Sequence, residues 1–309
     1  MATPLRTLLA RELAKQLFPD NAFYTNALRD GGSKGIAIDA KTVQVTEEGT
    51  IPDSVLDPTT FPLAATVRTD ATTEYETHLF ATKPTVVTDD EELLVNYDRR
   101  SVILTAHGKR LNTDVANFIA HAWASNADGT FLTTGTTSRT ASAPGATGNR
   151  KKATKDDILK IQEYFDKLDI LPQDRYAVLP TELYSDLAQI DDFINYEKRG
   201  LVDMISMGLI GEIYGFRIFK RSAVVNYDMT TPTTPVLRAI GAAGGANDSL
   251  AGIFWQAQTV RYAYGNPTVY VNTNRGEYLG TTLNTAVRSG GYTSYSNGKG
   301  VAMLIQDIA

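Results

Sequence analysis

The longest regular pattern of apolar positions lies between residues 91 and 124. From Leu94 to Ala122, apolar or small side chains recur at alternating spacings of three and four, which places them on one face of a helix. A helix of this length would extend about 50 Å. Gly108 lies on the same face, where glycine costs up to about 1 kcal/mol relative to alanine, so we expect a bend or a close backbone contact there.

Two shorter amphipathic helices are predicted. Residues 4–18 place leucines on one side between two prolines, which mark the start and the end of a helix. The second helix begins after Thr154, where Asp156 and Asp157 suit the positive end of a helix dipole. It carries apolar residues on one face as far as Leu168.

Strand patterns occupy much of the remaining chain. A threonine-rich segment from Leu63 to Val87 is joined by a turn-rich connection, residues 47–62, to an alternating segment that contains Val43 and Val45. Together these segments predict a long hairpin. Further strands are predicted at residues 36–38, 236–240, 253–264, 269–271, 278–287 and 301–305. Two segments rich in Gly, Ser, Thr or Ala are expected to be loops or linkers, residues 126–147 and 289–300.

The stretch from Asp174 to Val225 combines several of these signals. Tyr176 to Leu179 is a short apolar run, which Pro180 ends because it fixes its own φ and restricts the preceding residue. Thr181 is placed to cap the helix that follows. After a link punctuated by glycines, residues 213–224 return to a β-branched and aromatic pattern. The predicted order is strand, helix, irregular link and strand.

Two segments of this stretch carry a resemblance. Glu-Leu-Tyr-Ser-Asp-Leu at residues 182–187 follows a strand that ends in Leu-Pro, and Gly-Glu-Ile-Tyr-Gly-Phe-Arg-Ile-Phe comes later, at residues 211–219. In this order they resemble the axial domain of the major capsid proteins of tailed double-stranded DNA bacteriophages. The resemblance implies the α+β fold of Hong Kong 97 type, with an N-terminal arm, an extended β-hairpin loop, a peripheral domain with a long spine helix, and an axial domain.

The resemblance also implies how the chain divides. The long helix would be the spine helix and would lie flat in a shell wall, and the hairpin would reach over a neighbouring subunit. The expected parts are an N-terminal arm at residues 1–32, an extended loop at 33–88, a peripheral domain at 89–150 and 253–297, and an axial domain at 151–252 and 298–309.

The function implied is that of a major capsid protein, many copies of which assemble in the host cytoplasm into the icosahedral head of a virion. Its partners would be copies of itself in hexamers and pentamers, portal and decoration proteins, and packaged DNA contacted without sequence specificity. About 32 residues precede the first strand pattern. That is too few for the large N-terminal scaffolding segment of some relatives, so a separate scaffold protein or none is expected.

Three alternatives stay open. An encapsulin-type nanocompartment shell protein would share the fold and package an enzyme instead of a genome. A soluble α+β hydrolase with a carboxylate site would belong to another class and would be a stable monomer. Another virion protein, such as a tail-tube or decoration subunit, is disfavoured by the long helix, because those proteins are mostly compact β folds.

Composition and charge narrow these possibilities. The 309 residues are 42% hydrophobic, enough for a sizeable core. A net charge of -5 lacks the basic footprint of a nucleic-acid or membrane-surface binder. The absence of cysteine excludes disulfides, thiolate metal sites and cysteine nucleophiles. No run approaches the roughly 20 apolar residues of a membrane helix, and charged residues interrupt the N-terminal leucines where a signal peptide would be continuously apolar.

Catalytic and metal-binding motifs are missing from the sequence. The histidines are His78, His107 and His121. The last two would lie about 21 Å apart along the long helix, too far to share a metal, so we expect structural or surface roles. No phosphate-binding loop, nucleophile elbow, zinc-protease helix or EF-hand loop occurs. We therefore predict no enzyme activity, no cofactor and no metal site, and we assign no catalytic residue.

Clusters of like charge have structural interpretations. Three of the four carboxylate pairs lie near predicted helix starts, where the dipole explains them; the pairs are Asp89-Asp90, Glu91-Glu92, Asp156-Asp157 and Asp191-Asp192. The basic clusters lack the interleaved aromatics of a stacking platform for single strands. We interpret them as solvated faces or as salt-bridge partners between subunits, with one or two facing packaged DNA. They are Arg99-Arg100, Lys109-Arg110, residues 150–152, Lys198-Arg199 and Lys220-Arg221.

A covalent cross-link between subunits is suggested by the resemblance alone. Some capsid proteins of this fold join a lysine of the extended loop to an asparagine near the peripheral tip of a neighbour. Lys41 or Lys83, and Asn266, Asn272 or Asn274, lie in the matching regions. No motif singles them out, and we do not expect the cross-link.

Overall fold

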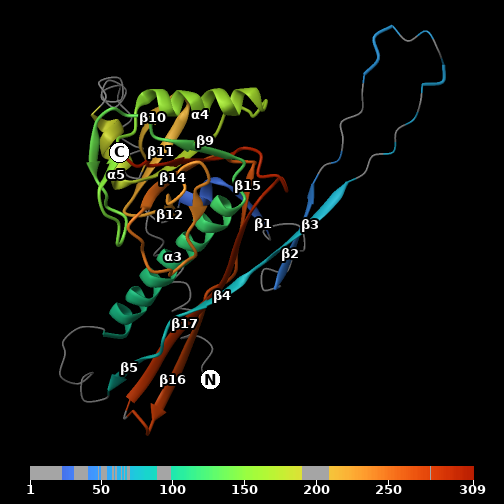
Figure 1. The fold of residues 1–309 in the computed structure, drawn as a ribbon. Helices are drawn as coiled ribbons and strands as arrows, with labels where there is room; N and C mark the ends of the chain where they lie inside the picture. Colours follow the sequence, from blue (N-terminus) through green and yellow to red (C-terminus); the bar gives the residue numbers. More distant parts are fainter. Residues whose placement is uncertain are drawn as a thin grey trace.

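A computed structural model places two β-sheets, a long helix packed against both, and a two-stranded ribbon that projects from the body (Figure 1). It describes residues 23–30, 41–47, 49, 54–57, 59, 61–63, 65, 67, 70–88, 99–189, 209–278 and 280–309. The helix predicted at residues 4–18, the strand at 36–38 and the first residues of the long helix lie outside the described residues.

Eight strands form the larger sheet. They are β6 (Gly129–Leu132), β9 (Arg175–Pro180), β10 (Leu209–Ile213), β11 (Phe216–Arg221), β12 (Val225–Asp228), β13 (Val236–Leu237), β14 (Asp248–Gln256) and β18 (Val301–Ile305). β14 is central, because it pairs with β9, β12 and β18. The predicted final strand is confirmed as β18, which lies between β14 and the parallel strand β6.

Both faces of this sheet are covered, so its middle strands are buried along their whole length. The covering helices are α3 (Arg99–Ser125) on one face and α4 (Lys155–Lys167) and α5 (Thr181–Ala188) on the other. Alternate residues of a strand point to opposite faces. Tyr176 and Val178 of β9 therefore join the cluster under α3, whereas Ala177 and Leu179 join the cluster under α4 and α5.

The helix starts follow the sequence in one case and depart from it in the other. α4 begins after Thr154 as predicted, and the Asp157 carboxylate accepts a hydrogen bond of 2.9 Å from the backbone N–H of Thr154. Thr181 is predicted as the cap of α5, but it is the first helical residue and Pro180 precedes the helix. The Thr181 hydroxyl donates instead to the carbonyl of Arg221, at 3.2 Å.

The smaller sheet is organised around one long strand, β17 (Gly280–Thr293). One edge of β17 pairs with β15 (Val260–Tyr264) and then β16 (Thr268–Arg275). The other edge pairs with β4 (His78–Ala81) and β5 (Thr85–Thr88). A short strand, β1 (Leu28–Asp30), adds to β15 in parallel. This sheet joins strands from both ends of the chain.

α3 confirms the long predicted helix, with an end one residue beyond the predicted 124. Its described 27 residues extend about 40 Å and run without interruption through Gly108, which is buried. The helix lies on β17, where a Cβ added to Gly291 would meet Ile119 Cγ2 and Trp123 Nε1, each at 3.3 Å. A glycine at this position lets the helix approach the sheet closely.

Two sequence predictions around β17 are wrong. Residues 253–264, predicted as one strand, form the end of β14 and all of β15, which belong to different sheets. A turn separates them, in which the N–H of Thr259 donates to the carbonyl of Gln256 at 3.0 Å. The loop predicted from residue 289 begins only after Thr293, because Gly291 makes room for α3 and Gly290 packs closely against Tyr75 and Glu76 of β3.

The predicted loop at residues 126–147 is also partly wrong. It contains β6 and the strand β7 (Ser138–Thr140), which pairs with β8 (Asn149–Lys151). Phe131 and Leu132, the apolar anchors of this segment, lie in β6 opposite Leu304 and Ile305. The partner of β6 is β18, at the far end of the chain, so the local sequence pattern around β6 cannot predict the pairing.

The predicted hairpin is confirmed in part, by β2 (Thr42–Glu47) and β3 (Ala71–Glu76), which pair antiparallel along their whole length. Its second segment, predicted to extend from Leu63 to Val87, is divided, because β4 and β5 pair with β17 instead. Val43 and Val45 pack with Tyr75 and with Ala263 of β15, and this contact anchors the base of the ribbon. The ribbon leads away from both sheets (Figure 1). We call β2, β3 and the described residues between them the hairpin arm.

Candidate functional site

The histidines do not converge. His78 of β4 is exposed, with its ring centroid 4.8 Å from that of Phe118. His107 of α3 is buried, and its Nε2 lies 2.9 Å from the hydroxyl oxygen of Thr85. Burial lowers the pKa of His107, so the ring is neutral at pH 7. His107 therefore ties α3 to β5.

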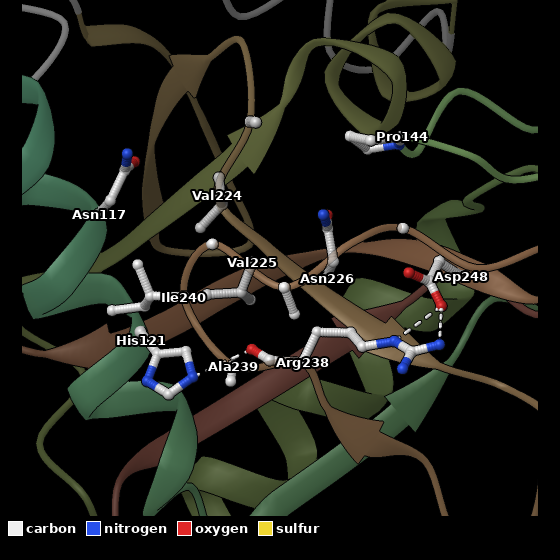
Figure 2. A pocket seen from close by; sticks show the side chains of 14 residues that line it. Asn117, His121, Pro144, Val224, Val225, Asn226, Arg238, Ala239, Ile240 and Asp248 are labelled. Atoms are coloured by element: carbon white, nitrogen blue, oxygen red, sulfur yellow. Dashed lines mark hydrogen bonds and ion pairs between the residues drawn. The ribbon is translucent and has the colours of Figure 1, made fainter.

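His121 lines a pocket of about 210 Å³ between α3 and the loop that follows β13 (Figure 2). Its Nε2 donates to the carbonyl of Arg238, at 3.1 Å. Burial lowers the pKa of His121, and the hydrogen bond to this carbonyl opposes the shift. Val224, Val225 and Ile240 supply apolar wall around the ring.

Arg238 holds the far side of the pocket together. Its Nε and Nη2 donate to the same oxygen of Asp248, at 3.0 and 2.8 Å, and the other Asp248 oxygen accepts from the N–H of Gly245 at 2.9 Å. Nη2 also lies 3.1 Å from a carboxylate oxygen of Asp228. Hydrogen bonds from Thr230 hold the pKa of Asp228 below its usual range, and Arg238 adds to this effect. The charged groups thus pair with one another.

The titratable groups in the described lining of the pocket are His121, Arg238 and Asp248. Its described lining includes no serine, threonine, tyrosine or lysine, so it offers no hydroxyl or amine nucleophile. The Asn117 side-chain oxygen accepts from Arg221 at 2.7 Å, and the buried oxygen of Asn226 has no hydrogen-bond partner in the described part of the chain. The arrangement can hold a small polar group but presents no nucleophile paired with a base.

The acidic pairs have structural roles where the structure describes them. Asp157 is buried and accepts hydrogen bonds from the backbone N–H and the hydroxyl of Thr134, at 3.1 and 2.6 Å, as well as from Thr154. It therefore joins the start of α4 to the end of β6. The pairs at residues 89–92 and 191–192 lie outside the described residues.

Arg150 and Arg221, each in a different basic cluster, are buried, so the interpretation as a solvated face is wrong for these two residues. Arg150 is only 2% exposed, and its guanidinium donates to four backbone carbonyls and to the hydroxyl of Ser249. Arg221 is also buried and reaches Asn117 on α3. Both arginines connect distant segments inside one subunit. Lys109 and Arg110 are exposed, as predicted.

The described residues contain no group of three side chains suited to hold a metal ion. Within the same ranges, no helix has the length and apolarity needed to cross a membrane. Lys41, Lys83, Asn266 and Asn272, named for a cross-link between subunits, are all exposed. The expectation that no such cross-link forms concerns two chains and stays a prediction.

The hairpin arm is the most unusual surface of the described chain. Its connection presents large apolar side chains to solvent, with Leu56 92%, Phe61 74% and Val67 88% exposed, together with Val55 and Leu63. Apolar residues gathered on one projecting segment mark an interaction surface more often than an isolated exposed leucine does. The sequence predicted the hairpin, but this exposure became visible only in the structure.

Comparisons with known proteins find similar structures but no similar sequences. No protein-family model matches the sequence, and no curated protein matches it either. Among solved structures, the capsid of cyanophage P-SCSP1u is 17% identical with a TM-score of 0.62, over 92% of this chain and 87% of that one. The capsid of Ralstonia phage GP4 is 12% identical with a TM-score of 0.61, over 93% and 91%.

A virus-like particle from Pyrococcus furiosus is also similar, at 11% identity and a TM-score of 0.53, over 98% of this chain and 100% of that one. These likenesses cover almost the whole chain, but their identities are low, so they speak to the fold alone. The chain therefore has the Hong Kong 97-type α+β fold.

Proposed function

We propose that this chain is a major capsid protein, copies of which assemble into the icosahedral head of a tailed phage around double-stranded DNA. The capsid structures that share its fold support this proposal. The observation on this chain that carries it is the hairpin arm, whose apolar side chains are exposed in the single subunit. Burying a leucine, valine or phenylalanine side chain contributes about 1.5–3 kcal/mol, so the arm favours contact with another copy.

Several finer points belong to the same proposal. Residues 1–32 would form an N-terminal arm, 33–88 the extended loop, 89–150 with 253–297 the peripheral domain, and 151–252 with 298–309 the axial domain. Portal, scaffold and decoration proteins would be partners, DNA would lie against the inner face, and assembly would take place in the host cytoplasm. The function would reside in surfaces, in keeping with the lack of a nucleophile in the pocket of Figure 2.

The test is assembly of the chain expressed alone, followed by size-exclusion chromatography and negative-stain electron microscopy. We expect shells, hexamers, pentamers or tubes. The triple variant Leu56→Ser, Phe61→Ser, Val67→Ser should stay unassembled yet unfold at the same urea concentration as the unassembled parent chain, because none of the three side chains is in the core. The matched control, Val236→Ser with Ile240→Ser, removes exposed apolar groups from the body and should assemble normally.

The alternatives predict different results. Shells that co-purify with an enclosed enzyme would indicate a nanocompartment instead of a capsid, an alternative that the likeness to the Pyrococcus particle keeps in view. A parent chain that stays monomeric at high concentration and with crowding agents would contradict the proposal.

A further inference from the structure

A second concave surface lies where the short 3-10 helix η2 (Phe23–Asn26) meets the end of β15. This pocket has a volume of about 240 Å³, and its walls include the rings of Tyr24, Tyr262 and Tyr264. The Tyr24 ring stacks on that of Tyr264, with centroids 6.5 Å apart, and meets that of Tyr262 edge-on at 5.3 Å. We call it the tyrosine pocket. Rings that brace one another in this way form a largely preformed apolar site.

Tyr24, one of the residues that line the tyrosine pocket, has a hydroxyl that is unpaired among the described residues. Tyr24 is 2% exposed, and its hydroxyl has no hydrogen-bond partner in the described part of the chain. Buried polar groups in folded proteins are nearly always hydrogen-bonded, so this unpaired hydroxyl is unusual for a residue that lines a pocket. Burial raises the pKa of Tyr24, and the neighbouring tyrosines raise it further. The group is therefore a neutral donor at pH 7.

Arg29 gives the tyrosine pocket its charge. It lines the pocket and is exposed, its Nη2 donates to the carbonyl of Tyr264 at 3.3 Å, and no described carboxylate pairs with it. The pocket therefore combines aromatic walls, a guanidinium and a buried phenol. An apolar side chain next to a carboxylate fits this combination, because the rings would cover the apolar group and Arg29 would bind the carboxylate.

The hairpin arm offers that chemistry. Leu56 is 92% exposed and is followed directly by Asp57, which is also exposed. From Glu47 to Asp70 the chain has five carboxylates and one arginine, so the arm is acidic where the pocket is basic. The arm leads away from the body of its own chain (Figure 1), which leaves a second copy as the donor.

We propose that the tyrosine pocket of one subunit receives the hairpin arm of another, with Leu56 against the tyrosine rings and the Asp57 carboxylate at Arg29. This inference rests on the proposed assembly function and adds a specific contact to it. It assigns Arg29 and the three tyrosines as the acceptor site for the arm.

Cross-linking of assembled particles tests this contact. The chain has no cysteine, so an introduced pair reacts without background. Val55→Cys with Asn266→Cys places one thiol beside Leu56 and the other at the pocket, since Asn266 lines it and is exposed. A short bismaleimide should then join subunits into a ladder on a denaturing gel. Val55→Cys with Val236→Cys, whose second thiol lies on β13, should give no ladder.

The outcomes separate this inference from the proposed function. Normal shells without a ladder from the Val55 and Asn266 pair would overturn the tyrosine pocket as the acceptor and leave the capsid proposal standing. Failure of the parent chain to form any assembly would remove the capsid proposal itself, and this contact with it.

Charge reversal at Arg29 and Asp57 tests the same contact independently if the cysteine variants fail to assemble. Arg29→Glu and Asp57→Arg should each weaken association about tenfold or more, because each places like charges together. The combined variant should recover most of the loss. Arg110→Glu, at an exposed position on α3, is the matched control. Normal assembly of Arg29→Glu, or a combined variant no better than the single ones, would contradict the contact.

Discussion

Replacing Arg150 with methionine should destabilise the isolated subunit by several kcal/mol while keeping most of the side-chain volume. The guanidinium donates to the carbonyls of Thr147, Asn149, Ala246 and Asp248 at 2.9–3.2 Å and to the hydroxyl of Ser249 at 2.7 Å. Burial lowers the pKa of Arg150, and the nearby charge of Asp248 opposes this decrease. The substitution removes five hydrogen bonds at once and leaves an apolar group among their acceptors.

The magnitude depends on which acceptors keep another donor. The carbonyl of Asn149 also accepts from the N–H of Ala309, and that of Ala246 accepts from the N–H of Thr147. The Thr147 carbonyl and the Ser249 hydroxyl have no second hydrogen bond in the described part of the chain. A buried polar group without a partner costs about 1–3 kcal/mol. Two such groups give a loss of about 2–6 kcal/mol.

Urea unfolding measured by tryptophan fluorescence checks this estimate, since Trp123 and Trp255 are both fully buried. Each Arg150 or Lys151 substitution should be made in the triple variant Leu56→Ser, Phe61→Ser, Val67→Ser, which we expect to stay unassembled, so that unfolding is measured on single subunits. Lys151→Met is the matched control, because Lys151 is the next residue and its ion pair with Asp307 is partly exposed, which limits the loss to about 1 kcal/mol. An Arg150→Met variant within 1 kcal/mol of its parent would refute the reasoning, and would mean that water takes over the five acceptors.

Two further predictions concern single positions. Gly298→Ala should lower the free energy of unfolding by about 3 kcal/mol, because φ is +72° and the added Cβ would lie 1.6 Å from the Asn126 carbonyl oxygen. Gly148→Ala is the control, since its φ is +77° but open space surrounds it, and it should lower the free energy of unfolding by about 1–2 kcal/mol. Equal losses for the two variants in urea unfolding would exclude the contact with Asn126. Burial lowers the pKa of His107 from 6.5, so the unfolded chain holds this proton more tightly and stability should fall as the pH drops below about 6.5. His107→Gln should reduce the difference between the urea midpoints at pH 7 and pH 5, and an unchanged difference would show that His107 contributes nothing to it.

Local sequence signals were enough to predict where several helices and strands begin or end. Pro180 ends β9 and starts α5, and the acidic residues after Thr154 start α4, as expected from steric and dipole effects within a few residues. The long apolar face of α3 and the strand at Val301–Ile305 followed from patterns that buried contacts require. Of these elements, β9 and α5 also carried the resemblance to the capsid fold.

The misses arose where the deciding partner lies far away in the sequence. Gly291 reads as a loop residue until Ile119 and Trp123 are placed against it. Arg150 reads as part of a basic surface until the carbonyls of Ala246 and Asp248 surround it. The exposure of Leu56 was equally hidden, because a polar, proline-containing connection does not show whether its apolar residues fold back. The tyrosine pocket joins residues more than two hundred positions apart, such as Tyr24 and Tyr264.

The place of β18 sets the order of events during synthesis. Residues 301–305 separate β14 from β6 in the middle of the larger sheet and supply side chains to both hydrophobic clusters. Until the ribosome has released residue 305, neither cluster can close and β6 has no strand beside it. The larger sheet therefore cannot be completed during synthesis before residues 301–305 are available to fold.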